Sequence, residues 1–349
     1  SIIITNSQGA GRKGLHRCEF LSTMAASSST RLQENMTDRD SPACAWMGET
    51  GIDDLPADVL SLVLRRLDGA SLAALGCASS SFRDLATDPE TWRGLCLALW
   101  PSVARIPGPA RCRDGDSFHR ALFADAFPFP TAAAAATVAP ALPARLVSAV
   151  DLHHRGVCIM SRVVETDASS AWFLGSPFRV DALLQEGFTA PSAIAPADLT
   201  LSWVLLDPTS GRAINASSRR PVSVNRSWLT GETVARFTVV LGGVALDAAV
   251  TCDDRYGHVR EVSLCVEDCD GGGVSGRDGL AALAAAMAAP RQGRGAEAEA
   301  RAARWYAEFV KGKSARKEWK ARREGLVDLC CSGVGAAAFV GFLVMLTCR

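Results

Sequence analysis

The sequence lacks a net charge, and it lacks the motifs that mark the common enzyme classes. Its 37 basic residues are balanced by 37 acidic residues, so no overall field draws the chain to nucleic acid. It has no GxxxxGK[ST], no GxGxxG after a strand, no HExxH and no GxSxG. We therefore expect no catalytic residue, no cofactor and no nucleic-acid partner.

The sequence also lacks the pattern of a disulfide framework, although the chain has 12 cysteines. No two of them form a CxxC pair and their spacing is irregular, which favours buried free thiols in a reducing compartment over disulfides. Cys252, His258, Cys265 and Cys269 are the nearest approach to a zinc site. Because Cys265 alternates with apolar residues as on a strand, we expect no metal there.

Residues 1–50 lack hydrophobic periodicity and are rich in Ser, Thr, Asp and Gln, so we expect them to be disordered. Ile2, Ile3 and Ile4 are too few for a secretory signal. Met24 is followed by small residues typical of a natural start, which leaves open that residues 1–23 are not translated.

Three short amphipathic helices are predicted for residues 51–100. The first follows Leu55-Pro56, and Asp68-Gly69 ends it. Ser71 can cap a second helix that continues, past a serine-rich interruption, to Leu85, and Thr91 opens the third. The apolar positions of the first helix recur at helical spacing: Val59, Leu60, Val63, Leu64 and Leu67. Three such helices bury little apolar surface alone, so we expect a partner.

The middle of the chain changes from linker to period-two patterning. Residues 101–143 are rich in Pro and Ala and read as a linker with a short helix at 118–127. Residues 144–270 indicate an antiparallel sandwich or curled sheet. The expected strands are 146–152, 157–164, 171–174, 199–206, 233–241, 246–252 and 259–266. Residues 271–295 hold a glycine-rich turn and an alanine-rich helix at 277–289. The predicted fold class is therefore α+β.

The end of the chain predicts a basic helix at 296–325 and a transmembrane tail at 326–348. Residues 329–348 carry no charge, and 20 helical residues cross about 30 Å of hydrocarbon. Seven basic residues precede this span: Lys311, Lys313, Arg316, Lys317, Lys320, Arg322 and Arg323. Their excess predicts a tail anchor with the bulk of the protein on the cytosolic face of an internal membrane. The alternatives are a buried C-terminal helix and a soluble cytoplasmic or nuclear protein.

The helical segment resembles an F-box, and this resemblance implies a function. It rests on Leu55-Pro56-x-Asp58-Val59-Leu60, Phe82-Arg83-Asp84-Leu85 and Asp88-Pro89-x-x-Trp92. In F-box proteins such residues insert into a groove on a Skp-type adaptor, which joins them to a cullin. By resemblance, the adaptor contact is carried by Leu55, Pro56, Val59, Leu60, Val63, Leu64 and Leu67, supported by Phe82, Leu85 and Trp92.

The rest of the chain resembles a plant F-box family that joins one F-box to a β-rich domain. The resemblance rests on residues 149–152, 172–181, 199–203, 217–224, 228–231 and 258–263. It implies that the β-rich domain at 144–270 holds a target protein, which the sequence does not identify. Arg219 and Arg220 beside Trp228 are candidates for an anion pocket on that domain, and a solvated turn is the alternative.

Three functions fit these patterns. The first is a non-catalytic substrate receptor of an SCF-type ubiquitin ligase. The second is a membrane-tethered interaction protein whose F-box serves assembly without degradation. The third is a hydrolase or sugar-binding β domain that uses Trp172, Trp203 and Trp228.

Overall fold

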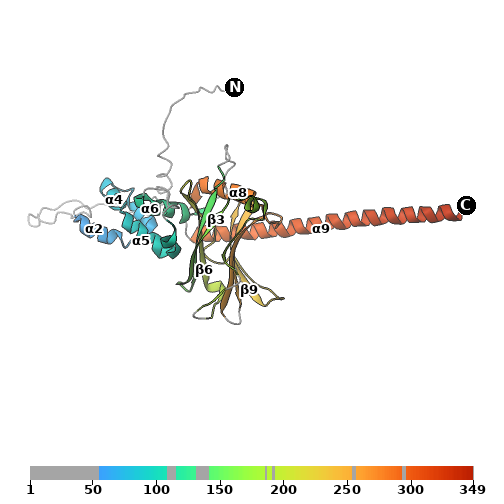
Figure 1. Cartoon of the computed structure of the whole chain (residues 1–349), viewed down its shortest axis with the longest axis horizontal. Helices are drawn as coiled ribbons and strands as arrows, with labels where there is room; N and C mark the ends of the chain where they lie inside the picture. Colours follow the sequence, from blue (N-terminus) through green and yellow to red (C-terminus); the bar gives the residue numbers. More distant parts are fainter. Residues whose placement is uncertain are drawn as a thin grey trace, which may run out of the picture. The chain divides into compact units, whose positions relative to one another are not determined.

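The computed structural model describes residues 55–107, 115–130, 141–184, 187–190, 193–253, 257–292 and 296–348. The chain divides into two compact units, Ser1–Ala98 and Leu99–Arg349, coloured along the sequence in Figure 1. The predicted disorder at 1–50 and the low-complexity linker at 131–140 lie outside the described residues.

The described part of the first unit is helical, with four helices where three were predicted. They are α2 (Ala57–Leu64), α3 (Gly69–Leu75), α4 (Ser80–Leu85) and α5 (Pro89–Leu99), the last of which reaches the unit boundary. The predicted second helix is divided because Ser79 caps α4, accepting a hydrogen bond from the Phe82 amide at 3.1 Å. The cap of α3 is Asp68, and not Ser71 as predicted, since the Asp68 carboxylate accepts from the Ser71 amide at 2.7 Å.

The second unit begins with elements that cover one face of a sheet. These are the short 3-10 helix η2 (Pro101–Arg105), α6 (Gly115–Ala126) and β1 (Phe129–Pro130), which pairs with β12 (Arg291–Gln292). α6 realises the predicted short helix, and the rings of Trp100 and Phe123 pack with their centroids 6.1 Å apart.

Two antiparallel sheets form the body of this unit. The four-stranded sheet has the order β3-β2-β6-β7. Its strands are β2 (Arg145–His154), β3 (Val157–Asp167), β6 (Leu199–Asp207), which follows the 3-10 turn η4 (Pro196–Asp198), and β7 (Arg212–Asn215). The second sheet has the order β4-β11-β10-β9-β8, and β5 also pairs with β11. Its strands are β4 (Arg179–Leu183), β5 (Phe188–Thr189), β8 (Ser223–Arg226), β9 (Glu232–Leu241), β10 (Val244–Asp253) and β11 (His258–Asp268).

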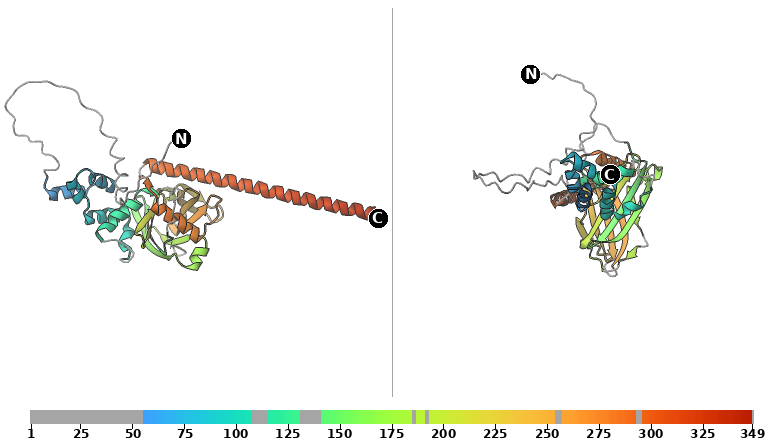
Figure 2. Two further views of the ribbon diagram at one scale, coloured as in Figure 1. Left: turned by 90° about the horizontal axis from the view of Figure 1, so that it is seen from above. Right: turned by 90° about the vertical axis from the view of Figure 1, so that its left-hand side faces the viewer.

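The two sheets enclose one core and are joined along one side. After β7 the chain bonds to both sheets, because the Ala216 amide donates to the Trp203 carbonyl at 2.7 Å and the Ser218 amide to the Phe237 carbonyl at 3.2 Å. The Trp203 and Phe237 side chains are fully buried in the core. The helix α8 (Gly276–Ala288) contributes Leu280, Leu283 and Met287 to the same core and lies across one end of the sheets (Figures 1 and 2).

Two predictions about the sheets are wrong. Residues 171–174 were expected to form a strand, but Ala171–Gly175 is the helix α7. The Ser170 hydroxyl caps it by accepting from the Phe173 amide at 3.2 Å, which supplies a helix start that the apolar run alone did not indicate. The strand expected at 157–164 is too short, because β3 continues to Asp167.

The C-terminal segments form one continuous helix, α9 (Ala296–Thr347), rather than two. Its first half packs on the outer face of the β8–β11 sheet. The Tyr306 hydroxyl lies 3.1 Å from the Ser223 hydroxyl, and the Lys313 ammonium pairs with the Glu267 carboxylate at 2.6 Å. The Arg316 guanidinium, which donates to the Cys269 carbonyl at 2.9 Å, makes the last such contact among the described residues.

Candidate functional site

A stripe of exposed apolar side chains runs along α2 and the residue before it. Leu55, Val59, Leu62 and Val63 are 44%, 43%, 64% and 52% exposed. Their spacing of four, three and one residues places them on one side of the helix. Aliphatic side chains this exposed are unusual on a module this small, and together they form an apolar face.

The remaining predicted adaptor residues hold that face in place. Leu60 and Leu64 of α2 are buried, as is Trp92 of α5. The Trp92 indole donates to the Ala86 carbonyl at 2.7 Å. The predicted set therefore divides into exposed side chains, including Pro56, and buried ones, with three half-buried members: Leu67, Phe82 and Leu85.

The start of α5, which carries Trp92, is fixed by a side-chain cap. The Asp88 carboxylate accepts hydrogen bonds from the Thr91 amide at 3.1 Å and from the Thr91 hydroxyl at 2.5 Å. The hydroxyl hydrogen bond lowers the pKa of Asp88 below its usual value. Asp88 is therefore charged at neutral pH, as an N-terminal cap requires.

Leu62 belongs to the exposed stripe but was not among the sequence-predicted residues. The signal was present, because Leu62 lies three positions after Val59 and seven after Leu55. Leu62 was left out because the predicted stripe already contained its neighbours Val63 and Leu64 at the regular helical spacing.

The residues of the predicted anion pocket lie on both sides of β8. Arg219 and Arg220 precede β8 and are exposed, whereas Trp228 follows β8 in the turn to β9 and is 93% exposed. The strand separates the arginines from the indole. The three tryptophans considered for sugar binding are also apart, because Trp203 is buried in the core while Trp172 and Trp228 are exposed on different segments.

The described residues contain no group of three or more His, Cys, Asp or Glu side chains that could hold a metal ion. Of the candidate ligands, Cys252 points into the core, whereas Cys265 lies opposite Asp247 on the outer face of the sheet. Burial lowers the pKa of His153 and raises that of Cys265. Both groups therefore favour their neutral forms.

The C-terminal half of α9 is exposed along its whole length. One helix of the described chain is long and apolar enough to cross a membrane, with a mean hydropathy of 2.2 in its most apolar window, and no residue of that window is buried. Apolar side chains on all sides of this half are exposed, among them Leu329, Phe339 and Leu343.

Comparisons with known proteins place these features in a family. Residues 52–98 match the family model described as F-box-like. The chain is 38% identical to "Probable F-box protein At2g36090" of Arabidopsis thaliana, covering 81% of this chain and 89% of the relative. It is 35% identical to "F-box protein At3g44326" of the same plant, covering 85% and 90%. The rice "F-box protein GID2" is 36% identical over 15% of this chain and 24% of its own length. No solved structure matches the chain.

Proposed function

The chain belongs to the plant F-box protein family, and on this premise we propose that it is the substrate-recognition subunit of an SCF-type ubiquitin ligase. F-box proteins are generally non-catalytic subunits of such ligases. In the proposed arrangement the α2 face binds a Skp-type adaptor, which connects the chain to a cullin, and the β-rich unit holds the target protein.

The observation that carries the adaptor proposal is the exposed stripe on α2. Leu55, Val59, Leu62 and Val63 present an apolar surface that the described residues of the helical unit do not cover. Insertion of such a stripe into an apolar groove is the usual way in which an amphipathic helix binds a partner. The buried residues Leu60, Leu64 and Trp92 act by positioning the stripe.

The β-rich unit is proposed as the target reader because its architecture suits binding rather than chemistry. Most of its large apolar side chains are packed into a single core between the sheets. A rigid scaffold with long strand edges can hold an extended protein segment.

The tail is proposed to anchor the protein in an internal membrane. Residues 329–347 are helical, and residues 329–348 are uncharged and exposed. The length of this segment matches the thickness of about 30 Å of a membrane core. The basic residues before this span favour retention of the preceding domains on the cytosolic side. Between Arg316, which contacts the β-rich unit, and Leu329 the helix rises about 20 Å at 1.5 Å per residue, so the target reader would be held close to the membrane surface.

Co-purification tests the proposed function. The full-length chain should capture the Skp-type adaptor and cullin, and the double substitution Leu55→Ala with Pro56→Ala should abolish that capture. Unchanged capture would contradict the assignment. Accumulation of a bound partner in cells that carry the double variant then distinguishes degradation of targets from tethering without degradation.

A further inference from the structure

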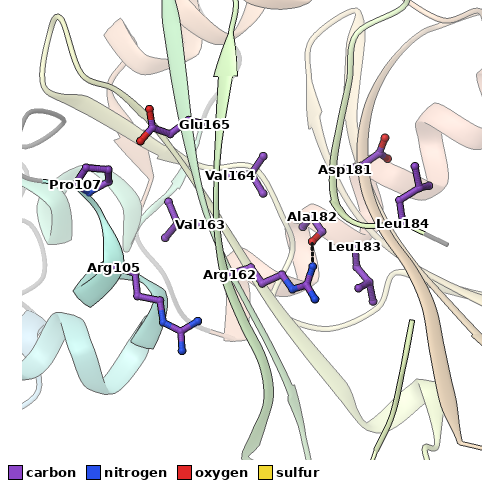
Figure 3. Close-up of a pocket in the computed structure, with 10 residues that line it drawn as sticks. All are labelled: Arg105, Pro107, Arg162, Val163, Val164, Glu165, Asp181, Ala182, Leu183 and Leu184. Carbon is purple, nitrogen blue, oxygen red and sulfur yellow. Dashed lines mark hydrogen bonds between the residues drawn. The ribbon is translucent and has the colours of Figure 1, made fainter. Parts of the chain in front are cut away.

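On one side of the unit, β3 of one sheet lies beside β4 of the other without pairing with it. We call the gap between these two strands the seam, and it holds a cavity of about 570 Å³. β3 and β4 are the outer strands of their sheets. No backbone hydrogen bond joins them among the described residues. Figure 3 shows side chains of β3 and β4 lining the cavity, with Arg105 and Pro107 at its side. Among the described residues, no further strand pairs with the outer edge of β3 or of β4, so either edge can accept another strand.

Arg162 is an unusual residue for its place in β3. It lies opposite Val150 of β2, whose side chain is buried in the core, so Arg162 also lies on the inward side of its strand. The Arg162 side chain is nevertheless exposed, because the seam is open at this point. Its guanidinium donates to the Ala182 carbonyl of β4 at 3.4 Å, as Figure 3 shows.

Arg105 approaches the same strand edge from the outward side. It belongs to η2, which is tied to β2 through Ser102 and the outward-facing Asp151. The Arg105 guanidinium donates to the Ser161 carbonyl of β3 at 2.8 Å. The cavity is thus flanked by one guanidinium from each face of the strand.

The two carboxylates that line the cavity are paired with arginines other than Arg105 and Arg162. Glu165 is paired with Arg145, and Asp181 with Arg179 at 2.8 Å. Within the described part of the chain, neither Arg105 nor Arg162 forms an ion pair with a carboxylate. Each instead contacts a single backbone carbonyl, which leaves most of its donors for a ligand.

We propose that this seam binds an extended acidic segment of the target protein, which adds as a strand at the edge of β3. This inference rests on the proposed role of the β-rich unit as target reader. Backbone hydrogen bonds would supply affinity, and a carboxylate or phosphate on each guanidinium would supply specificity.

The proposal specifies the spacing of the acidic groups. Successive side chains of a strand point to opposite faces, and Arg105 and Arg162 lie on opposite faces of β3. Two acidic side chains reach both arginines only when they are an odd number of positions apart. Adjacent acidic residues fit, and acidic residues two positions apart do not.

Peptide selection on the full-length chain tests this inference. The probes are pools of 12-residue peptides that are random except for two fixed central positions. These carry Glu-Glu, Glu-x-Glu, phosphoserine-phosphoserine or Ser-Ser. We expect the Glu-Glu or phosphoserine pool to be enriched about tenfold or more over the Ser-Ser pool, with Glu-x-Glu weaker than Glu-Glu. The stronger of the two adjacent pools identifies the anion as carboxylate or phosphate.

Charge-reversed variants complete the test. Arg105→Glu with Arg162→Glu should remove the enrichment, and the milder Arg105→Gln with Arg162→Gln should reduce it without repulsion. Arg277→Glu with Arg304→Glu, two exposed arginines on the same unit, is the matched control and should retain it. No enrichment by the unmodified chain, or equal enrichment by the charge-reversed variant, would overturn the proposal. Aggregation of the Arg162 variants without peptide selection by the native chain would show instead that Arg162 only guards the strand edge.

Adaptor capture measured on the same preparations separates this inference from the proposed function. Capture without peptide selection overturns the seam alone. Failure of capture contradicts the receptor role itself.

Discussion

The buried carboxylate of Asp151 accepts two hydrogen bonds from Ser102, one from the amide at 2.9 Å and one from the hydroxyl at 2.6 Å. These bonds fasten η2, and with it Arg105, to the outward side of β2. Burial raises the pKa of Asp151 above its usual value of 3.8, although the hydrogen bonds from Ser102 oppose the shift.

The raised pKa of Asp151 predicts a pH-dependent stability. Between 3.8 and the raised pKa the folded state retains a proton that the unfolded state releases, so this group contributes less stability as the pH rises. Asp151→Asn removes the titration. We expect the difference in unfolding free energy, native minus variant, to fall as the pH rises from 3.8 through the raised pKa, as measured by denaturant unfolding of the full-length chain.

Asp167→Asn is the control with the opposite sign. Hydrogen bonds from Ser169 lower the pKa of Asp167, so its contribution appears above the usual pKa and is lost as the pH falls. A stability difference for Asp151→Asn that grows with pH in the same way would contradict the assignment of Asp151 as a buried, raised carboxyl.

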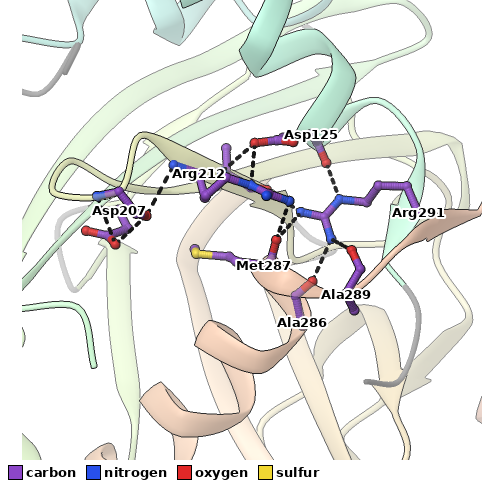
Figure 4. A network of polar contacts seen from close by, with 9 residues as sticks. Asp125, Asp207, Arg212, Ala286, Met287, Ala289 and Arg291 are labelled. Atoms are coloured by element: carbon purple, nitrogen blue, oxygen red, sulfur yellow. Dashed lines mark hydrogen bonds and ion pairs between the residues drawn. The ribbon is translucent and has the colours of Figure 1, made fainter. Parts of the chain in front are cut away.

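A second buried charge, Arg291, connects the end of α8 to α6 and β7 (Figure 4). Its guanidinium donates to the backbone carbonyls of Asp125, Ala213, Ala286, Met287 and Ala289. Arg212 reinforces the junction by pairing with the Asp125 carboxylate at 3.1 Å.

We predict that Arg291→Met lowers the free energy of unfolding of the β-rich unit by about 3 kcal/mol, because several buried carbonyls lose their donor at once. Chemical denaturation followed by tryptophan fluorescence measures this loss. Arg277→Met, at an exposed position of α8, should change stability by no more than about 0.5 kcal/mol. Equal effects of the two substitutions would show that the Arg291 network is not a stabilising junction.

Removal of residues 325–349 tests the tail anchor. The deletion begins beyond Arg316, where the described contacts of α9 with the sheet end, so the β-rich unit should remain folded. We expect the full-length chain to stay in the membrane pellet after alkaline carbonate extraction and the shortened chain to be soluble. Release of the full-length chain into the supernatant would rule out a spanning helix.

The long elements were predictable because each carries a complete periodic signal. The stripe on α2 and the apolar runs of β2, β6, β9, β10 and β11 follow the periods of a helix and of a strand. The turn between β9 and β10 falls in the gap left between the expected strands 233–241 and 246–252, and the positive φ of 65° at Gly242 explains the glycine there.

The short elements were not predictable, because tertiary contacts decide them. β8 has four residues, of which Val224, Asn225 and Arg226 are exposed, so no alternation marks it as a strand. β4 carries the charged residues Arg179 and Asp181, which form an ion pair in the structure. In the sequence, two charges in so short a segment favour a loop.

The positions of the two arginines at the seam could not be predicted from the sequence, for a different reason. Ser161 and Arg162 are adjacent polar residues within an otherwise apolar run, so the sequence does not say which of them faces inward. Only the pairing of β3 with β2 places Arg162 on the inward side. The placement of Arg105 beside the same strand depends on a hydrogen bond between residues 49 positions apart, Ser102 and Asp151. No local pattern in the sequence contains that information.

Adaptor binding through α2 is the central claim, and a matched pair of substitutions tests it most directly. Val59 on α2 and Val224 on β8 are almost equally exposed, at 43% and 41%, so Val59→Asp and Val224→Asp place the same charge on equally accessible sites. We predict that Val59→Asp weakens the affinity of the purified full-length chain for a Skp-type adaptor at least about tenfold, because the carboxylate would be buried at the contact. Val224→Asp should leave the affinity unchanged. Equal affinities for the two variants would contradict adaptor binding through the α2 face.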